Sequence, residues 1–386
     1  MSASIIVSFF NVNDYELPKK YLQETLRHAL NSGSEVVFSQ AVLPGQDPLP
    51  YPPGVISLVY EVPSYFFYKE NLWNLAAKKA SGDILIFIDA DVTYTNPDWV
   101  KNAEEALKTC DIVQPFTKAV WLDEFGNLEK ERIPCSHQLI DDEKIGLSIS
   151  HPGFGWAMTR EAFDRIGGWY DQAANGAGDV AFVFSLASES QFDLVMKFFP
   201  EQDRMVLTPS FQKYREHVDS LGLTVGRVPE CVVTHKWHGT MRNRNYCRRD
   251  KCMPRIDDYE YNLVRREDGV LVWGDEKSAE AFKELFSTRL DDGTPPKVIL
   301  ISKDHVANNE IALRLRAVQF EIKTTDGNCV GIYITPLTDL IESNKKQGLP
   351  VLTGLVSADC LSGSPASEYW RDIAEDYPDI KFVLYY

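Results

Sequence analysis

Long apolar runs are absent from this sequence, and no stretch approaches the ~20 residues that a membrane-spanning helix needs. Residues 1–20 have no basic region followed by a sufficiently long apolar run, so no secretory signal peptide is expected. The seven cysteines include no Cys-x-x-Cys pair, which favours free thiols in a reducing compartment over a zinc site or a disulfide framework. These absences predict a soluble, cytoplasmic protein.

Positive charge is also scarce. The chain has 40 lysines and arginines against 56 acidic residues, which gives a net charge of −16 at pH 7. This balance excludes a surface coated with positive charge for wrapping nucleic acid, but it still allows a local basic groove. One candidate for such a groove is the stretch 236–266, where basic residues outnumber acidic ones.

Apolar residues are numerous enough for a large core. Of the 386 residues 44% are hydrophobic, and this length fits one large domain plus a small one, or two domains. Up to about residue 120, apolar runs alternate with helical patterns. We expect strands at 4–10, 35–43, 55–62, 83–91 and 111–116, and helices at 17–33, 67–82 and 97–110. This alternation predicts a doubly wound α/β sheet, in which ligands bind at the carboxyl ends of the strands.

The rest of the chain is expected to form further parts. Residues 121–150 are polar and weakly patterned, which predicts a loop-rich insertion. Charge, glycine and two prolines cluster at 287–297, which indicates a domain boundary. We therefore expect a domain over 1–290, with halves 1–120 and 121–290. A small α/β module of unknown role would follow over 291–386.

The stretch GDILIFIDADVTYTNPDWV (Gly82–Val100) ends an apolar strand in two aspartates, Asp89 and Asp91. Alternate side chains of an extended segment point the same way, so both carboxylates can converge on one divalent cation, which prefers oxygen ligands. Such a cation can neutralise a diphosphate leaving group. The alternative is that the aspartates cap the next helix or form a turn. A cap needs only one of them, whereas two carboxylates after a buried strand cost desolvation unless a cation or hydrogen bonds compensate.

With the following NPDW, this strand resembles the nucleotide-sugar domain of the GT-A fold glycosyltransferases. YKENLWNLA (Tyr68–Ala76) resembles the Lys-Glu-x-x-x-Asn helix of phage- and bacteria-encoded members. HPGFGWAMTREAFDRIGGWYD (151–171) resembles the acceptor-side segment of galactosyltransferases and polypeptide N-acetylgalactosaminyltransferases. NGAGDVAF (175–182) stands where those enzymes carry Gly-Gly-Glu-Asp or Gly-Gly-Glu-Asn, and VTHKWHG (233–239) where they carry a late metal-binding histidine. The resemblance covers roughly residues 4–275 and implies a GT-A mixed sheet flanked by helices.

The resemblance also implies a metal site and a catalytic base. Asp89, Asp91 and His235 would bind Mn²⁺ or Mg²⁺, and neutral imidazole suits such a site. Asp179 would remove the proton of the acceptor hydroxyl. The alternatives are a pair of surface histidines in a basic loop, and an N-cap for the helix after Asp179. Gly178 departs from the glutamate of galactosyltransferases, so a contact to acceptor or sugar is expected to be missing.

Donor and acceptor contacts follow from the same resemblance. The donor-binding residues would be Asn11, Glu61, Lys69, Asp89, His238, Arg242 and Arg244, the arginines through the diphosphate. Gly155 and Trp156 would contact the acceptor, because an aromatic ring next to glycines suits stacking on a sugar face. The alternatives are surface positions for Glu61 and Lys69, a solvated basic face for the arginines, and a core position for Trp156.

The expected function is a metal-dependent, inverting glycosyltransferase that moves a sugar from a UDP-sugar to a hydroxyl acceptor. Retention stays open, because one of the two resembling families retains. The likeness to phage-type members suggests a hydroxymethylated pyrimidine of phage DNA as acceptor, in the host cytoplasm. A saccharide or lipid-linked glycan is the alternative acceptor. Alternatives from other classes are a non-catalytic module that binds a glycan or a partner, and a metal-dependent hydrolase, which should carry a denser cluster of His and Asp.

Overall fold

The structure is a computed structural model of the chain. It describes residues 2–123, 126–143, 145–174, 176–188, 190–191, 208–240, 243–244 and 262–293, together with four strands after residue 296. The chain divides into two compact units, Met1–Gly293 and Thr294–Tyr386. Among the described helices, none combines the length and the apolar character that crossing a membrane requires.

A seven-stranded sheet forms the centre of the first unit, in the order β11-β6-β10-β4-β1-β2-β3. β1 pairs in parallel with β2 and β4, and β2 with β3, whereas β10 lies antiparallel between β4 and β6. The sheet is therefore mixed, which confirms the fold class expected from the sequence. Its strands are β1 (Ala3–Phe10), β2 (Glu35–Val42), β3 (Val55–Glu61), β4 (Ile84–Ile88), β6 (Ile112–Val113), β10 (Gly155–Thr159) and β11 (Val225–Gly226).

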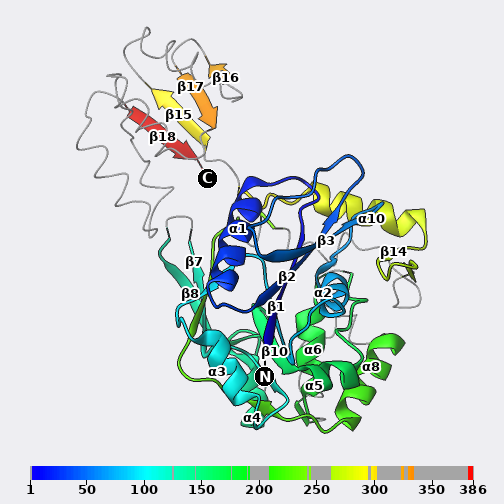
Figure 1. Ribbon diagram of the computed structural model, residues 1–386. Coiled ribbons are helices and arrows are strands. Elements are labelled where there is room, and N and C mark those ends of the chain that lie inside the picture. The colour runs from blue at the N-terminus through cyan, green and yellow to red at the C-terminus, as the bar shows by residue number, and fades with distance from the viewer. Residues whose placement is uncertain are drawn as a thin grey trace. The chain divides into compact units, whose positions relative to one another are not determined.

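Helices cover both faces of this sheet (Figure 1). The core on one face includes α1 (Glu16–Leu30) and α3 (Trp99–Ala106). The core on the other face includes α2 (Lys69–Ala77), α5 (Arg160–Ile166), α6 (Gly178–Leu186) and α8 (Pro209–Ser220). All five residues of β4 are buried, and alternate side chains belong to the two cores. A continuous apolar strand of this kind is typical of a sheet that is covered on both faces.

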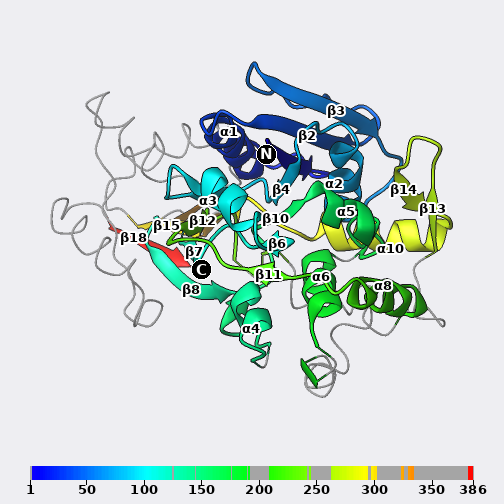
Figure 2. The ribbon, with the colours of Figure 1, turned by 60° about the horizontal axis from the view of Figure 1, so that its bottom comes forward.

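A second sheet has five strands in the order β5-β12-β7-β8-β9. They are β5 (Val92–Tyr94), β12 (Val232–His235), β7 (Lys118–Leu122), β8 (Leu128–Pro134) and β9 (Ser150–His151). Figure 2 shows β7, β8 and β12 grouped near α3 and away from α8. The prediction of a loop-rich insertion is wrong for residues 128–140, which form β8 and α4 (Cys135–Ile140). Most residues of β8 are charged or exposed, so its sequence lacks the apolar run that marks a buried strand.

The last elements of the first unit are β13 (Leu263–Arg265), β14 (Leu271–Trp273) and α10 (Glu276–Ser287). After α10 the chain returns to the start of α1. The Asp292 carboxylate there accepts hydrogen bonds from the backbone N–H groups of Glu16 and Leu17, at 2.9 and 2.7 Å. The rings of Phe286 and Phe10 lie 6.2 Å apart. This return places the end of α10 beside the carboxyl end of β1.

The described part of the second unit is an antiparallel sheet in the order β16-β17-β15-β18. Its strands are β15 (Lys297–Ile301), β16 (Lys323–Thr325), β17 (Cys329–Tyr333) and β18 (Lys381–Tyr385). The apolar stretch 349–357, which belongs to the predicted module, lies outside the described residues. A small α/β module over 291–386 stays a proposal.

Candidate functional site

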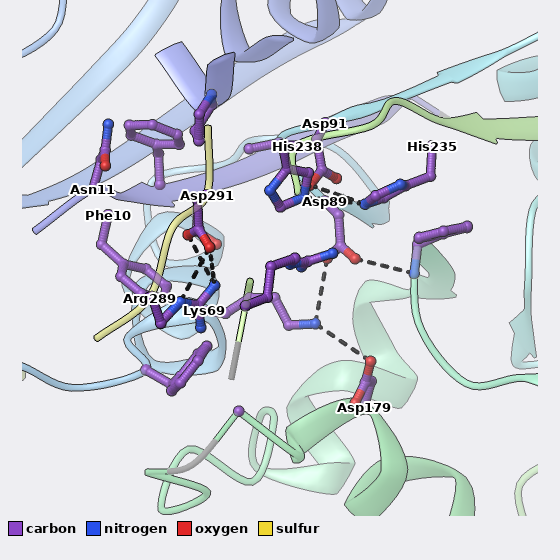
Figure 3. Close-up of a pocket in the computed structure, with 18 of the residues that line it drawn as sticks. Phe10, Asn11, Lys69, Asp89, Asp91, Asp179, His235, His238, Arg289 and Asp291 are labelled. Atoms are coloured by element: carbon purple, nitrogen blue, oxygen red, sulfur yellow. Dashed lines mark hydrogen bonds and ion pairs between the residues drawn. The ribbon is translucent and has the colours of Figure 1, made fainter. Parts of the chain in front are cut away.

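A cavity of about 440 Å³ lies at the carboxyl ends of β1 and β4. The two aspartates after β4 line it, together with Lys69 from the start of α2 and Asp179 from the start of α6 (Figure 3). This edge of the sheet is where ligands of open α/β folds bind. The cavity is more basic than the chain as a whole. Its charged side chains, histidines apart, are Lys69, Lys130, Arg132, Arg244 and Arg289 against Asp89, Asp91, Asp179 and Asp291.

Asp91, His235 and His238 form a candidate metal centre. The Asp91 Oδ2 atom lies 3.4 Å from His235 Nε2 and 3.0 Å from His238 Nε2, and the two Nε2 atoms are 3.3 Å apart. Ligand atoms about 3 Å apart match neighbouring positions around an octahedral ion with bonds of about 2.1 Å. The other carboxylate oxygen, Asp91 Oδ1, is buried without a hydrogen-bond partner in the described part of the chain. The donor set therefore fits a divalent cation such as Mn²⁺ or Mg²⁺.

The strand ends bring these three side chains together. Asp91 precedes β5, His235 ends β12, and these strands pair antiparallel with His235 opposite Val92.

Burial, with the positive Arg244 nearby, lowers the pKa of His238 to about 4, so its imidazole is neutral at pH 7, as a metal ligand requires. Burial acts against ionisation of Asp91, but the adjacent histidines prevail and hold its pKa well below the usual range.

Asp89 has a different set of partners. Its Oδ1 lies 3.3 Å from Lys69 Nζ, and its Oδ2 accepts a hydrogen bond of 3.2 Å from the Phe154 backbone N–H. Burial raises the pKa of Asp89, while the charge of Lys69 acts in the opposite direction. Burial alone would lower the pKa of Lys69, but Asp179 and Asp89 raise it well above its usual value, so this ammonium stays charged. Lys69 is thus part of the cavity wall and is not a surface residue.

Asp179 lies across Lys69 from Asp89, with 3.6 Å between its Oδ2 and Lys69 Nζ. Its other oxygen accepts a hydrogen bond of 2.8 Å from the Val180 N–H. The residue at the N-cap of α6 is Ala177, which makes no side-chain capping bond. Asp179 therefore lies inside the first turn of α6, with one carboxylate oxygen toward the ammonium group of Lys69.

Two further expected donor contacts, Asn11 and Arg244, line the cavity. The Asn11 side chain is engaged within its own loop, since it donates to the Tyr15 carbonyl at 2.7 Å and accepts from the Tyr15 N–H at 3.0 Å. It therefore shapes the loop after β1. Arg242 lies outside the described residues.

Three expected residues lie away from the cavity. Glu61 is exposed at the end of β3, where its backbone carbonyl accepts a hydrogen bond from Arg266 at 2.7 Å. Trp156 is 1% exposed, and its indole N–H donates to the Pro152 carbonyl at 2.7 Å. Gly155 fits so tightly that a Cβ there would lie 2.3 Å from the Tyr94 hydroxyl. The pairing of β10 with β4 places Trp156 in the core beside Phe87. Trp156 therefore occupies the core position that was the alternative to an acceptor contact.

Glu70 is a site residue that the sequence reasoning missed. It is 1% exposed, and its carboxylate lies 3.6 Å from Lys69 Nζ. Burial, with the negative Asp179 nearby, raises its pKa to about 7. A Cβ at Gly178 would lie 2.2 Å from the Glu70 carboxyl carbon. The Glu70 side chain therefore fills the space beside Gly178, the position at which galactosyltransferases carry a glutamate. Its place next to Lys69 in the expected Lys-Glu motif was the available signal.

Arg289 was also missed. It is 6% exposed, and its guanidinium pairs with Asp291 at 2.9 Å. The same group lies over the rings of Phe67 and Phe286, at 5.2 and 5.6 Å from their centroids. Its Nη1 atom is buried and has no hydrogen-bond partner in the described part of the chain. No local pattern marks this residue, since it reaches the cavity only through the return of the chain after α10.

Residues 67–167 match the family model described as Glycosyl transferase family 2. The matched segment includes α2, β4, the Asp-x-Asp pair and β10, and it ends before Asp179 and His235. This segment of the chain is thus similar to the family, in agreement with the expected class of nucleotide-sugar transferases. No curated protein matches the chain.

Several solved structures resemble this one weakly. A mannosyltransferase from Pyrobaculum calidifontis, in complex with GDP-Man and Mn²⁺, has 14% identity and a TM-score of 0.37, over 96% of this chain and 84% of that one. Glucosyl-3-phosphoglycerate synthase from Mycobacterium tuberculosis, with Mn²⁺ and UDP, has 10% identity and a TM-score of 0.32, over 61% and 70%. TarS 1–349 of S. aureus, with UDP-GlcNAc, has 17% identity and a TM-score of 0.31, over 48% and 52%.

Proposed function

We propose that the protein is a metal-dependent glycosyltransferase that moves a sugar from a UDP-sugar to a hydroxyl group, with inversion at the anomeric carbon. The observation that carries this proposal is the meeting of a metal-type donor set with Lys69 and Asp179 in one cavity. The family match of residues 67–167 supports it. A nucleotide sugar offers a diphosphate that a cation can neutralise, and an anomeric carbon that an acceptor hydroxyl attacks as a nearby base removes its proton.

The donor diphosphate would bind at the cation site. Asp91, His235 and His238 would hold Mn²⁺ or Mg²⁺, with Asp89 beside them. The bound ion would supply positive charge that stabilises the departing diphosphate. Lys69, charged and fixed between two carboxylates, adds a second positive charge there. Arg289 would donate its unpaired Nη1–H to the nucleotide at the carboxyl end of β1, with Arg244 as a further donor contact.

Asp179 would act as the general base. Its carboxylate accepts the proton of the acceptor hydroxyl as that oxygen attacks the anomeric carbon. The bond from that carbon to the diphosphate breaks, and its electron pair leaves with the diphosphate. Because the attack comes from the face opposite the leaving group, the configuration inverts. The hydroxymethylated pyrimidine of phage DNA remains a candidate acceptor on sequence resemblance only, since most of the basic stretch 236–266 lies outside the described residues.

The test is release of nucleoside diphosphate from a panel of nucleotide sugars, with and without Mn²⁺. We expect metal-dependent release from one UDP-sugar, and loss of that release in Asp91→Asn. Asp98→Asn is the matched control, because this aspartate is exposed and pairs with Lys101. Absence of both release and thermal stabilisation with every donor would instead favour a non-catalytic binding module.

A further inference from the structure

The hairpin of β7 and β8 presents two cations to the cavity. Lys130 and Arg132 are alternate residues of β8, so they share one face of the strand, and both line the cavity. Lys130 Nζ lies 4.4 Å from the centroid of the Trp121 ring, and Arg132 Cζ lies 5.6 Å from it. Trp121 is 8% exposed and itself lines the cavity. An ammonium and a guanidinium are therefore held over one indole.

The acidic residue between them does not neutralise these charges. Glu131 belongs to the opposite face of β8 and pairs with Lys118 at 3.0 Å. Arg132 makes no ion pair within the part of the chain that the structure describes. Burial, followed by the charge of Arg132, lowers the pKa of the neighbouring His151 well below its usual value, so this ring is neutral at pH 7 and adds no charge of its own. This wall of the cavity therefore presents the guanidinium of Arg132 without a counter-ion among the described residues, and a bound anion would compensate its charge.

The same wall is continuous with Asp179. A Cβ at Gly153 would lie 2.5 Å from Asp179 Oδ2 and 3.2 Å from His151 Nε2, so both side chains border the small space beside this glycine. The His151 ring in turn lies 4.6 Å from the Trp121 ring. The donor contacts Asn11 and Arg289 come from other elements, the end of β1 and the chain after α10. The hairpin cations thus adjoin the side of the cavity where the proposed base would meet the acceptor.

We propose that Trp121, Lys130, Arg132 and His151 bind a phosphate group of the acceptor, so that the acceptor is a phosphorylated hydroxyl compound. This inference rests on the proposed function and adds the chemical class of the acceptor. A guanidinium offers two parallel N–H donors to phosphate oxygens, and the ammonium adds a point charge. A phosphate monoester of a small molecule and a phosphodiester of a polymer share this chemistry, and the transfer assay separates them.

The first test measures phosphate binding without catalysis. The protein is saturated with UDP and Mg²⁺, so that the donor diphosphate site is filled, and inorganic phosphate is then titrated with the melting temperature as readout. We expect stabilisation of the wild type and of Lys118→Ala, which removes a cation on the other face of the hairpin. We expect none in Arg132→Gln, and a reduced effect in Lys130→Gln. An equal response of Arg132→Gln, or no response of the wild type, would overturn the proposal.

The second test compares acceptors with and without phosphate. The pairs are glycerol with glycerol 3-phosphate and ribose with ribose 5-phosphate, together with a single-stranded oligonucleotide as phosphodiester. We expect kcat/KM to favour the phosphorylated compounds, and Arg132→Gln to reduce that preference by about 10- to 100-fold, the range for a lost charged hydrogen bond. Transfer to the small esters identifies a monoester, and transfer to the oligonucleotide alone identifies a phosphodiester.

The failures of the two proposals are distinguishable. Equal use of the neutral compounds, alongside metal-dependent hydrolysis of the donor, contradicts the phosphate site and leaves the glycosyltransferase proposal in place. Failure of the glycosyltransferase proposal would instead appear as the absence of donor hydrolysis. If no compound of the panel accepts the sugar, the phosphate titration decides the matter.

Discussion

The two sides of the cavity differ in how they balance the charge of an aspartate. Asp89 and Asp91 leave the same strand end, one residue apart. Asp89 faces the ammonium of Lys69 and the Phe154 N–H, whereas Asp91 faces the Nε2 atoms of two histidines. At pH 7 the Lys69 side therefore carries its own counter-ion. The histidine side holds the neutral His238, so we expect the Asp91 carboxylate to be compensated by a cation from solution.

From this difference we infer separate tasks for Asp89 and Asp91, which look equivalent in the sequence. A protonated lysine cannot ligate a metal, but it can hold Asp89 and Asp179 in place. Neutral imidazoles and a buried, ionised carboxylate can ligate one. We therefore expect loss of the metal to follow changes on the histidine side, and loss of proton transfer to follow changes on the lysine side.

The largest effect is expected from Asp91→Asn. It should lower metal-dependent turnover of the donor by about 1000-fold or more, because the cation contributes several kcal/mol of charge stabilisation. Asp89→Asn should cost less, since Lys69 remains and adds positive charge beside the diphosphate. The measurement is nucleoside diphosphate release as a function of Mn²⁺ concentration. Equal losses in the two variants would remove the distinction between the two sides.

Asp179→Asn should come next. Transfer to the acceptor should fall by about 100-fold or more, as is typical when a general base is lost. The dissociation constant of the UDP-sugar, measured by calorimetry, should change little, because the amide keeps the shape of the side chain. An unchanged transfer rate would reduce Asp179 to its hydrogen bond with the Val180 N–H.

Glu70→Gln should alter the pH dependence of stability. The pKa of Glu70 is about 7 in the folded protein, above the usual value of a glutamate, so the folded state binds the extra proton between those two values. Stability should therefore fall as pH rises through this window, by an amount on the order of 3 kcal/mol for this residue. Melting curves from about pH 4.5 to 8 should be flatter for the variant than for the wild type. Parallel curves would show that Glu70 does not titrate there.

The smallest effect is expected from Arg289→Met. It removes the buried guanidinium between Phe67 and Phe286 while it keeps much of the apolar volume. The dissociation constant for UDP should rise by about tenfold, in the range of a lost hydrogen bond to a charged group. Mn²⁺ binding should persist, because Arg289 is not among the candidate ligands. Calorimetric titration of UDP checks this, and an unchanged affinity would remove Arg289 from the donor site.

Local patterns were sufficient to predict the parts of the site that depend on strand ends. The apolar run of β4 followed by Asp89 and Asp91 is visible in the sequence, and so is the spacing of His235 and His238. The structure brings Asp91 and both histidines together because β5 and β12 pair. That pairing is a long-range contact, so the sequence could indicate it only through a resemblance.

Other parts depended on packing that no local pattern reveals. From the sequence, Gly155 and Trp156 fit a surface that stacks on a sugar and a buried core strand equally well. The register of β10 against β4 places Trp156 in the core. β8 was not predicted because its charged residues give no apolar strand pattern. Its conformation is stabilised by backbone pairing with β7. Arg289 is more than 270 residues away from Tyr15 in the sequence, yet its carbonyl accepts a hydrogen bond from the Tyr15 hydroxyl. This long-range contact helps to hold Arg289 at the cavity.

The most direct measurement is a titration of Mn²⁺ into the wild type, Asp91→Asn and Asp89→Asn in the presence of UDP, followed by electron paramagnetic resonance. We predict one bound ion per wild-type chain, loss of binding in Asp91→Asn, and weakened but detectable binding in Asp89→Asn. Undiminished binding in Asp91→Asn would contradict the assignment of Asp91, His235 and His238 as the metal centre.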